Sequence, residues 1–279
     1  MRPRTPLARP LQYVALCAYI VFLAFPMLWL VSTAFKTPRD LGAIVQHWVP
    51  PHPTVRNFAD AFADQPIAHA ALNSLIVAVC AAVITVVLST PAAYVLARYR
   101  TAMNRVTLGW VLLSQIFPVI LIVVPLFLVL KQAGLTDTLT GLCVVHVVWN
   151  MPFALWMLQG YVRAVPPVLE EAASVDGAGR MRALVHVVFP LLRPGVVATL
   201  LFSFINSWNE FFFAMVLLKN DPGQQTLPVV LTRFIGAQGV ADLGPLAAAS
   251  ILATVPSLVF FLIIQRRLTA GLLTGAVKG

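Results

Sequence analysis

Six long apolar runs, separated by shorter polar segments, set the pattern of this chain. They cover roughly residues 13–35, 72–97, 106–130, 139–160, 195–218 and 246–265. A helix needs about 20 residues to cross the roughly 30 Å hydrocarbon core of a bilayer, so each run is long enough to cross it once. The pattern predicts an all-α polytopic membrane protein with six transmembrane helices, built as a single transmembrane domain over residues 1–279.

The composition indicates that this chain lies in a lipid bilayer, and it excludes a soluble domain. Hydrophobic residues make up 59% of the sequence and charged residues only 10%, whereas soluble domains carry about 25% charged residues. The first apolar run is longer than the core of a signal peptide, which has about 7–15 residues. We therefore expect this run to be a retained span.

The basic residues predict how the chain is oriented, because cytoplasmic loops carry an excess of Lys and Arg. With six spans, both termini lie on one side, and that side holds most of the 19 basic residues: Arg2, Arg4, Arg9, Arg98, Arg100, Arg105, Arg163, Arg180, Arg182, Arg193, Arg266, Arg267 and Lys278. The other side consists of segments 36–71, 131–138 and 219–245, with Lys36, Arg39, Arg56, Lys131, Lys219 and Arg233. Both termini and the loop 161–193 are therefore predicted to be cytoplasmic. The net charge of +9 does not indicate nucleic-acid binding, since the basic residues flank apolar runs.

The loop 161–193, called the polar loop below, is the longest polar passage between apolar runs. Pro166-Pro167 favours a helix start, and the acidic pair Glu170 and Glu171 would then lie near the positive end of the helix dipole. Gly177 can end this helix in a left-handed cap. A second short helix is expected over Arg180–Phe189, stopped by Pro190. An ordinary solvated loop is the alternative.

The fifth run has one polar face. At 100° per residue, four side chains lie within about 40° of one another, and Ser207 and Asn209 flank them; the four are Thr199, Ser203, Asn206 and Glu210. A carboxylate within hydrocarbon costs a few kcal/mol and usually lines a pathway or pairs with another group. We therefore predict that this face lines a polar pathway, with helix–helix adhesion as the alternative.

Other polar residues within the runs give weaker signals. Gln115 in the third run and Asn150 in the fourth fit pathway lining and helix–helix adhesion equally well. His146 is expected to be a packed, hydrogen-bonded histidine rather than a proton relay, and Asn73-Ser74 a cap at the start of the second span. Cys17, Cys80 and Cys143 each lie in an apolar run, which supports neither a disulfide framework nor a zinc site.

Motifs for catalysis are missing from the sequence. It contains no P-loop, no HExxH zinc motif and no GxSxG nucleophile elbow. We therefore expect no catalytic residues, and no metal or cofactor bound by this chain.

Three passages give the chain a specific family resemblance. Glu171-Ala172-Ala173, Gly177 and Val187-Val188-Phe189-Pro190 have the spacing of the EAA loop of ABC importer permeases, although Val187 and Phe189 stand where Ile and Leu are usual. Ser207-Trp208-Asn209-Glu210-Phe211 and the tail from Leu273 to Gly279 resemble the sugar-importing branch. Over nearly its whole length, the chain resembles the second permease subunit of maltose-type importers.

The resemblance implies a fold of six transmembrane helices with a cytoplasmic coupling helix, and a role for three groups of residues. Docking on a cytoplasmic ATPase would involve Glu170, Glu171, Ala172, Ala173, Asp176, Gly177 and Pro190. The substrate pathway predicted above would comprise Ser203, Asn206, Asn209, Glu210, Gln115 and Asn150. An external binding protein would touch Gln224, Gln225, Thr226 and Gln238.

The resemblance also implies a set of partners and a location. The chain would form a heterodimer with a second homologous permease and would provide half of a carbohydrate pathway across a prokaryotic inner membrane. Two ATP-binding subunits would hold the ATP and magnesium, and an external sugar-binding protein would deliver the substrate. The alternative is a stand-alone proton-coupled secondary transporter with Glu210 and His146 as its relay.

Overall fold

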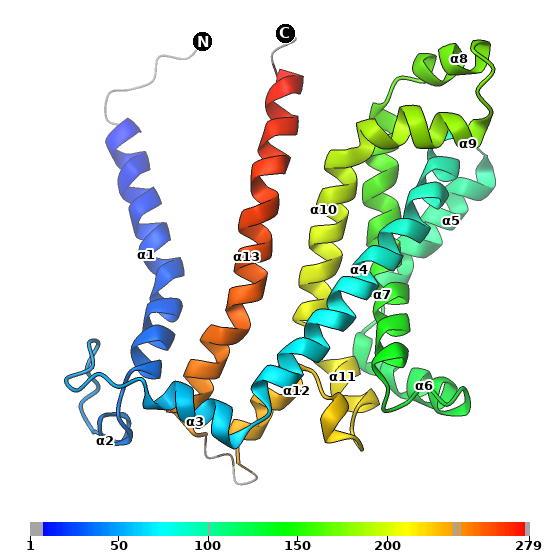
Figure 1. The fold of residues 1–279 in the computed structure, drawn as a ribbon. Coiled ribbons are helices and arrows are strands. Elements are labelled where there is room, and N and C mark those ends of the chain that lie inside the picture. The colour runs from blue at the N-terminus through cyan, green and yellow to red at the C-terminus, as the bar shows by residue number, and fades with distance from the viewer. Residues whose placement is uncertain (1–7, 100, 237–238, 240, 277–279) are drawn as a thin grey trace. The chain divides into compact units, whose positions relative to one another are not determined.

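Helices make up nearly all of the chain. The computed structural model describes residues 8–99, 101–236, 239 and 241–276, and within these residues the only β pairing is one isolated bridge between Ile235 and Ala241. The helices, shown in Figure 1, are α1 (Ala8–Ala34), α2 (Pro38–Leu41), α3 (Arg56–Asp64), α4 (Ile67–Arg98), α5 (Ala102–Leu113), α6 (Val119–Gln132), α7 (Leu139–Ala164), α8 (Val168–Val175), α9 (Arg180–Ala183), α10 (Phe189–Trp208), α11 (Phe212–Leu217), α12 (Leu227–Leu231) and α13 (Leu243–Ala276). A π-helical segment, Leu184–Val188, joins α9 to α10.

Within the described residues, 5 helical stretches are long and apolar enough to cross a membrane. They are Gln12–Ala34 in α1, α4, α7, the continuous stretch Arg180–Trp208, and Leu243–Ile263 in α13. Counting the bent pair α5 and α6 as one more crossing gives 6. This agrees with the predicted all-helical polytopic membrane protein.

The described chain divides into two compact units. One comprises residues 1–67 and 230–254, and the other comprises residues 68–229 and 255–279. In the first unit, Asn57 Nδ2 donates hydrogen bonds of 2.8 Å to the carbonyls of Ala34 and Lys36, which closes the end of α1. The buried Lys36 ammonium lies 4.1 Å from the centre of the Trp29 ring, where a cation–π contact offsets part of its lost hydration.

The third apolar run, predicted as one span over about residues 106–130, is sharply bent within that span. The stretch Gly109–Ile116 and the helix Val119–Gln132 are bent by 102° relative to each other. The cause is Pro118, because a proline pushes the residue before it out of the helical region. Phe117 accordingly has ψ 128° and Pro118 has ψ 124°, both outside the helical range.

The helix that contains the fifth run begins and ends at other residues than the sequence predicts. Pro190 does not stop a separate helix, because the π segment leads into α10 without a break. In a regular α-helix this proline would clash with the carbonyl of His186; the N–H of Phe189 instead bonds to Leu184 five residues back, which gives the wider turn of a π-bulge. At the other end α10 stops at Trp208, and α11 begins only at Phe212.

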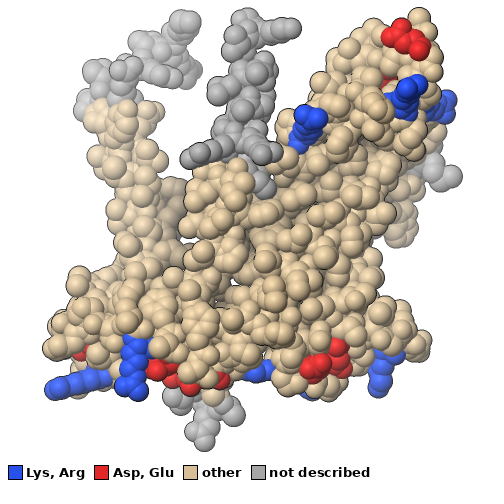
Figure 2. Space-filling view, viewed as in Figure 1, with Lys and Arg blue, Asp and Glu red and all other residues tan. Residues whose placement is uncertain are grey.

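In the second unit, an apolar cluster lies near each end of α4. The first surrounds Val77 and includes Leu142, Phe213 and Leu217. The second surrounds Tyr94 and includes Val162 and Leu192. On the face shown in Figure 2, charged side chains gather over α8 and α9 at one end of this unit and over the loops near α6 and α11 at the other. The uncharged surface between them matches the part that the sequence assigns to lipid.

Candidate functional site

The polar loop folds into α8, a tight turn and α9, largely as its sequence predicts. Pro167 is the N-cap of α8, and Glu170 and Glu171 lie in its first turn. Gly177 has φ +81°, which only glycine adopts without strain. Its N–H donates to Ser174 (3.1 Å) and the N–H of Ala178 donates to Ala173 (2.9 Å). These two bonds form a Schellman motif, which satisfies the last carbonyls of α8.

Glu170 holds α8 against the end of α4, which the sequence did not reveal. Its Oε2 accepts a 2.6 Å hydrogen bond from the Tyr94 hydroxyl, and its Oε1 lies 2.7 Å from Arg98 Nε and 2.5 Å from Arg98 Nη2. The Arg98 and Glu170 side chains are only 14% and 15% exposed. Glu170 therefore faces α4, so any part that it has in ATPase coupling comes through the position of α8 and not through direct contact as the fold stands.

Arg98 also reaches the chain that leads into α8. Its Nη2 donates a 2.9 Å hydrogen bond to the Val165 carbonyl, just before Pro166-Pro167. Since this arginine holds both the carboxylate of α8 and the backbone that precedes the helix, it fixes the position and the direction of α8. Charge-assisted bonds of this kind are roughly twice as strong as neutral ones.

The other predicted docking residues remain on the outside of α8 or in its turn. Glu171, Ala172 and Asp176 are exposed, and Ala173 is half-buried. Exposed apolar side chains accompany them: Val168, Leu169, Val175 and Met181. Val175 is 88% exposed, and such apolar groups on a polar loop are typical of an interaction surface. Pro190, by contrast, lies inside the first turn of α10.

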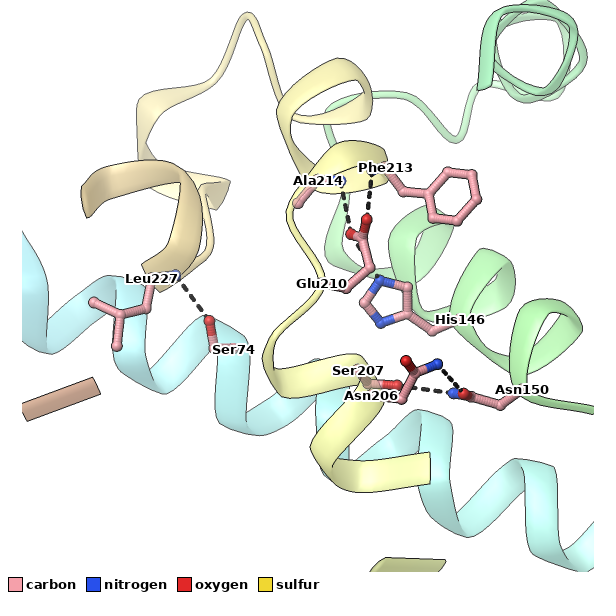
Figure 3. A network of polar contacts seen from close by, with 9 residues as sticks. All are labelled: Ser74, His146, Asn150, Asn206, Ser207, Glu210, Phe213, Ala214 and Leu227. Carbon is pink, nitrogen blue, oxygen red and sulfur yellow. Dashed lines mark hydrogen bonds and ion pairs between the residues drawn. The ribbon is translucent and has the colours of Figure 1, made fainter. Parts of the chain in front are cut away.

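Glu210 is the centre of a second polar cluster, where the fifth span is broken (Figure 3). Its Oε1 accepts from the N–H of Phe213 (2.7 Å) and its Oε2 from the N–H of Ala214 (3.1 Å). The carboxylate therefore caps the first turn of α11, where the helix dipole favours a negative charge. The sequence placed Glu210 on a continuous helical face with Asn206, but the helix ends before it.

His146 of α7 is the second partner of Glu210. Its Nε2 lies 3.3 Å from Glu210 Oε2, while its Nδ1 is buried and has no hydrogen-bond partner within the described residues. This favours the tautomer that carries its proton on Nε2. A proton relay takes up a proton at one ring nitrogen and releases it at the other, and within the described residues only Nε2 has a partner.

An amide chain joins α7 and α10 one turn further along (Figure 3). Asn206 Nδ2 donates to Asn150 Oδ1 (2.7 Å), and Asn150 Nδ2 donates to Ser207 Oγ (3.0 Å). Asn150 is buried, and Asn206 is half-buried. These groups therefore hold two helices together.

The remaining predicted pathway residues do not join this chain. Ser203 is fully buried, and its hydroxyl has no partner among the described residues. Asn209 is exposed and donates back to Ile205 in its own helix (2.8 Å). Gln115 is exposed at the bend of the third run and makes one long contact, 3.5 Å, with the Trp149 carbonyl.

Asn73 and Ser74 do not cap the second span, because α4 begins six residues earlier, at Ile67. They bind the loop before α12 instead. Asn73 Nδ2 donates to the carbonyls of Gly223 (2.8 Å) and Gln225 (3.0 Å), and Ser74 Oγ accepts from the N–H of Leu227 (2.8 Å, Figure 3). We call residues 221–227 the outer loop.

The outer loop contains three of the four residues predicted to touch a binding protein. Gln224 and Gln225 are half-buried, so part of each remains accessible. Thr226 is buried, which removes it from any contact surface of this chain as it stands. Gln238 lies outside the described residues. Ligand pockets in proteins have volumes of about 300–1,000 Å³. A cavity of ≈ 670 Å³ lies beside the outer loop and is lined by Phe127, Met215, Val216, Lys219, Asn220, Gln225 and Val229.

An ion–dipole contact between Asp137 and Asn220 fixes the chain just before the outer loop. Both carboxylate oxygens of Asp137 accept 2.8 Å hydrogen bonds from Asn220, one from its N–H and one from its side-chain amide. Burial acts to raise the pKa of Asp137, but the bonds from Asn220 outweigh it and the pKa is lowered. The carboxylate therefore stays charged over the physiological pH range, and the loop stays held.

Comparison with known proteins identifies the family. Residues 86–273 match the family described as binding-protein-dependent transport system inner membrane component. ORF1 of Streptomyces antibioticus is 62% identical over 230 residues, which are 82% of this chain and 100% of that protein. The trehalose transport system permease protein SugB of Mycobacterium tuberculosis is 35% identical over 278 residues, or 98% and 99% of the two chains.

A solved structure has the same fold. It is the crystal structure of a bacterial ABC transporter involved in the import of the acidic polysaccharide alginate, with a TM-score of 0.78 at 19% identity over 95% of this chain and 99% of that one. The sequence match covers most of the chain, and the fold agrees with it. The chain therefore belongs to the family of binding-protein-dependent transport system inner membrane components, as a multi-pass permease of the inner membrane.

Proposed function

We propose that this chain forms half of the translocation pathway of an ATP-driven carbohydrate importer and that α8 is its contact with a cytoplasmic ATPase. The observation that carries the proposal is the construction of α8. This helix has two turns, is capped at its end by Gly177, is tied to α4 through Glu170, and presents Glu171 and the apolar Val175 outward. The cap at Gly177 and the contact of Glu170 with α4 would keep this short helix in place when it contacts an ATPase.

The proposed partners follow from the missing P-loop in the sequence and from the transport permeases among its relatives. The sequence has no P-loop, so two separate ATP-binding subunits would supply the energy, with ATP and magnesium bound there and no catalytic residue here. A second homologous permease would complete the pathway. Streptomyces coelicolor has two relatives of this chain, DasC and NgcG, each named as a diacetylchitobiose uptake system permease protein.

A carbohydrate is the proposed substrate class. Relatives are named for trehalose in Mycobacterium tuberculosis and for melibiose, raffinose and stachyose in Bacillus subtilis. Neutral amides such as Asn206, and the exposed Asn209, can exchange hydrogen bonds with sugar hydroxyls. The proposed mechanism is alternating access, in which ATP binding favours one of two states by acting differently on each.

A reconstitution experiment tests this proposal. The complex of both permeases and two ATPase subunits in proteoliposomes is expected to accumulate a radiolabelled disaccharide only when ATP and the loaded binding protein are both present. Trehalose, maltose and diacetylchitobiose are suitable probes. A pH gradient alone is expected to drive no uptake. Accumulation by this chain alone under a pH gradient, without ATPase, would instead support the proton-coupled transporter.

The proposed orientation gives a separate prediction about topology. Reporter fusions at Ala178 and at Lys278 are expected to give cytoplasmic signals, and a fusion at Gln224 an external signal. The reason is the excess of Lys and Arg on the side of the polar loop. Reporters active on only one side of the membrane, such as alkaline phosphatase and green fluorescent protein, make the measurement. An external signal at Ala178 would contradict the docking of α8 on a cytoplasmic ATPase.

A further inference from the structure

The helix α4 is attached to functional loops at both of its ends. It runs without interruption from Ile67 to Arg98. At 1.5 Å per residue, the stretch from Asn73 to Arg98 is about 37 Å long, which is enough to cross a bilayer. The outer loop is bound at one end of this stretch, and α8 is bound at the other.

The outer attachment consists of several bonds to the backbone of the loop. Asn73 holds two carbonyls, and Ser74 accepts one N–H. His69 Nε2, one turn earlier, lies 2.9 Å from the same Gly223 carbonyl that Asn73 holds. Asn73 and Ser74 are buried beneath the loop. Because these bonds engage main-chain atoms at Gly223, Gln225 and Leu227, the loop cannot shift along α4 without breaking them.

The inner attachment is the contact of Glu170 with Tyr94 and Arg98. These two residues lie four apart on α4, so they are neighbours on one face of the helix. Both contact the same carboxylate, one at each oxygen. The end of α4 and the first turn of α8 must therefore move together, or this part-buried charge pair must separate.

The body of α4 is closely packed on both sides of its internal Pro91. Its buried positions are mostly small residues, which allow close packing against neighbouring helices: Ala70, Ala78, Ala81, Ala82, Ser89, Ala93 and Ala97. Val77 packs in the cluster with Leu142 and Phe213, and Ala93 packs with Leu155 and Leu158 of α7. Such contacts along the helix make bending at one point costly.

We propose that α4 transmits the docking of the external binding protein from the outer loop to α8, with Asn73 and Glu170 as the positioning residues at its two ends. This inference rests on the proposed function and names the element that links its two docking surfaces. Spatial connection alone does not show coupling, which requires that both ends bias the same two-state element. The competing explanation is that both attachments only stabilise the fold.

A double-mutant cycle on the intact complex separates the two explanations. Asn73→Leu keeps the side-chain volume but removes both donors, and Glu170→Gln removes the charge that holds Arg98. ATP hydrolysis is measured against the concentration of the purified, loaded binding protein, together with basal hydrolysis and the amount of assembled complex. Leu75→Ala and Val95→Ala are matched controls, because both side chains lie on the same helix and are exposed.

The expected result is a loss of stimulation and not of assembly. Each single variant is expected to lower the maximal stimulation at saturating binding protein about fivefold or more, which is the range of ordinary coupling between sites. Basal hydrolysis should match the wild type in Asn73→Leu and in the two controls. Because Glu170 fixes α8, the stimulation of Glu170→Gln is expressed relative to the basal hydrolysis of that same variant. The maximal stimulation of the double variant should be no lower than that of the more impaired single variant, since either change already interrupts the same link.

Other outcomes overturn the inference. Full stimulation in both single variants, or a double variant whose loss is the product of the two single losses, would show that α4 is not the link. If a variant lowers only the amount of assembled complex, the attachment has a structural role. Ser74→Ala and Arg98→Lys each remove fewer bonds, and they are measured in case Asn73→Leu or Glu170→Gln fails to assemble. A wild-type complex that the binding protein does not stimulate would overturn the proposed function as well.

Discussion

Replacing Gly177 by proline is expected to abolish ATP-driven uptake while leaving the chain inserted in the membrane. Gly177 has φ +81°, and proline fixes φ near −65°, so the left-handed cap cannot form. The substitution also removes the N–H that donates to Ser174 and displaces the N–H of Ala178 from Ala173. A helix of only 8 residues has little stability of its own, so α8 should lose its defined outer face.

Two further variants make the Gly177 prediction specific. Gly179 has φ −70°, which suits proline, and its N–H donates no hydrogen bond in the described structure. Gly179→Pro should therefore retain uptake. Gly177→Ala should fall between the two, because a non-glycine residue in this conformation costs about 1–2 kcal/mol and there is open space around its new Cβ.

The measurements are ATP-driven uptake in proteoliposomes and the amount of ATPase subunit retained by the purified permeases. We expect Gly177→Pro to reduce both by at least about tenfold, the change that corresponds to 1.4 kcal/mol. Uptake near the wild-type rate with Gly177→Pro would show that the cap of α8 has no part in ATPase docking. An equal loss of uptake and of retained ATPase with Gly179→Pro would show that any proline in this turn disrupts docking, and that the effect is not specific to the cap at Gly177.

The parts of the fold that follow from local rules were predictable from sequence. Apolar length predicted α1, α4, α7 and α13, and proline, acidic residues and glycine at their preferred positions predicted α8. The breaks were harder to see. Pro118, in the third apolar run, bends the chain by 102°, whereas Pro190, near the end of the polar loop, is absorbed by a π turn. The neighbouring packing decides between these outcomes, and a single sequence does not contain it.

The candidate site shows the same division between local and long-range information. The sequence identified Glu170 and Glu171 together, but only the fold shows that Glu170 turns inward to α4. Tyr94 and Arg98 did carry a signal, since a hydroxyl and a cation four residues apart at the end of a span share one face. What was missing was their partner, which lies more than seventy residues away. Asn73 and Ser74 were misjudged for the same reason.

Replacing Glu210 by alanine is expected to lower the amount of assembled complex and to leave uptake per assembled complex near the wild-type value. Alanine would leave the N–H groups of Phe213 and Ala214 without their cap and His146 without its partner. Loss of a helix cap costs about 0.5–2 kcal/mol, and a buried donor left unpaired costs about 1–3 kcal/mol. Glu210→Gln keeps one acceptor oxygen, so its recovery should lie between alanine and wild type.

The same two measurements test whether Glu210 lines the pathway, as its sequence position first suggested. In that case recovery would stay normal, and uptake per complex would fall about 5- to 150-fold, the equivalent of losing one hydrogen bond of 1–3 kcal/mol to the substrate. Asn209→Ala is the matched control for assembly, because Asn209 is exposed and bonds only to its own helix. Both oxygens of Glu210 already accept hydrogen bonds, Oε1 from Phe213 and Oε2 from Ala214. A carboxylate has about four acceptor sites, so a substrate would have to share these oxygens with the cap of α11 or displace it, and displacement would require α11 to move during transport.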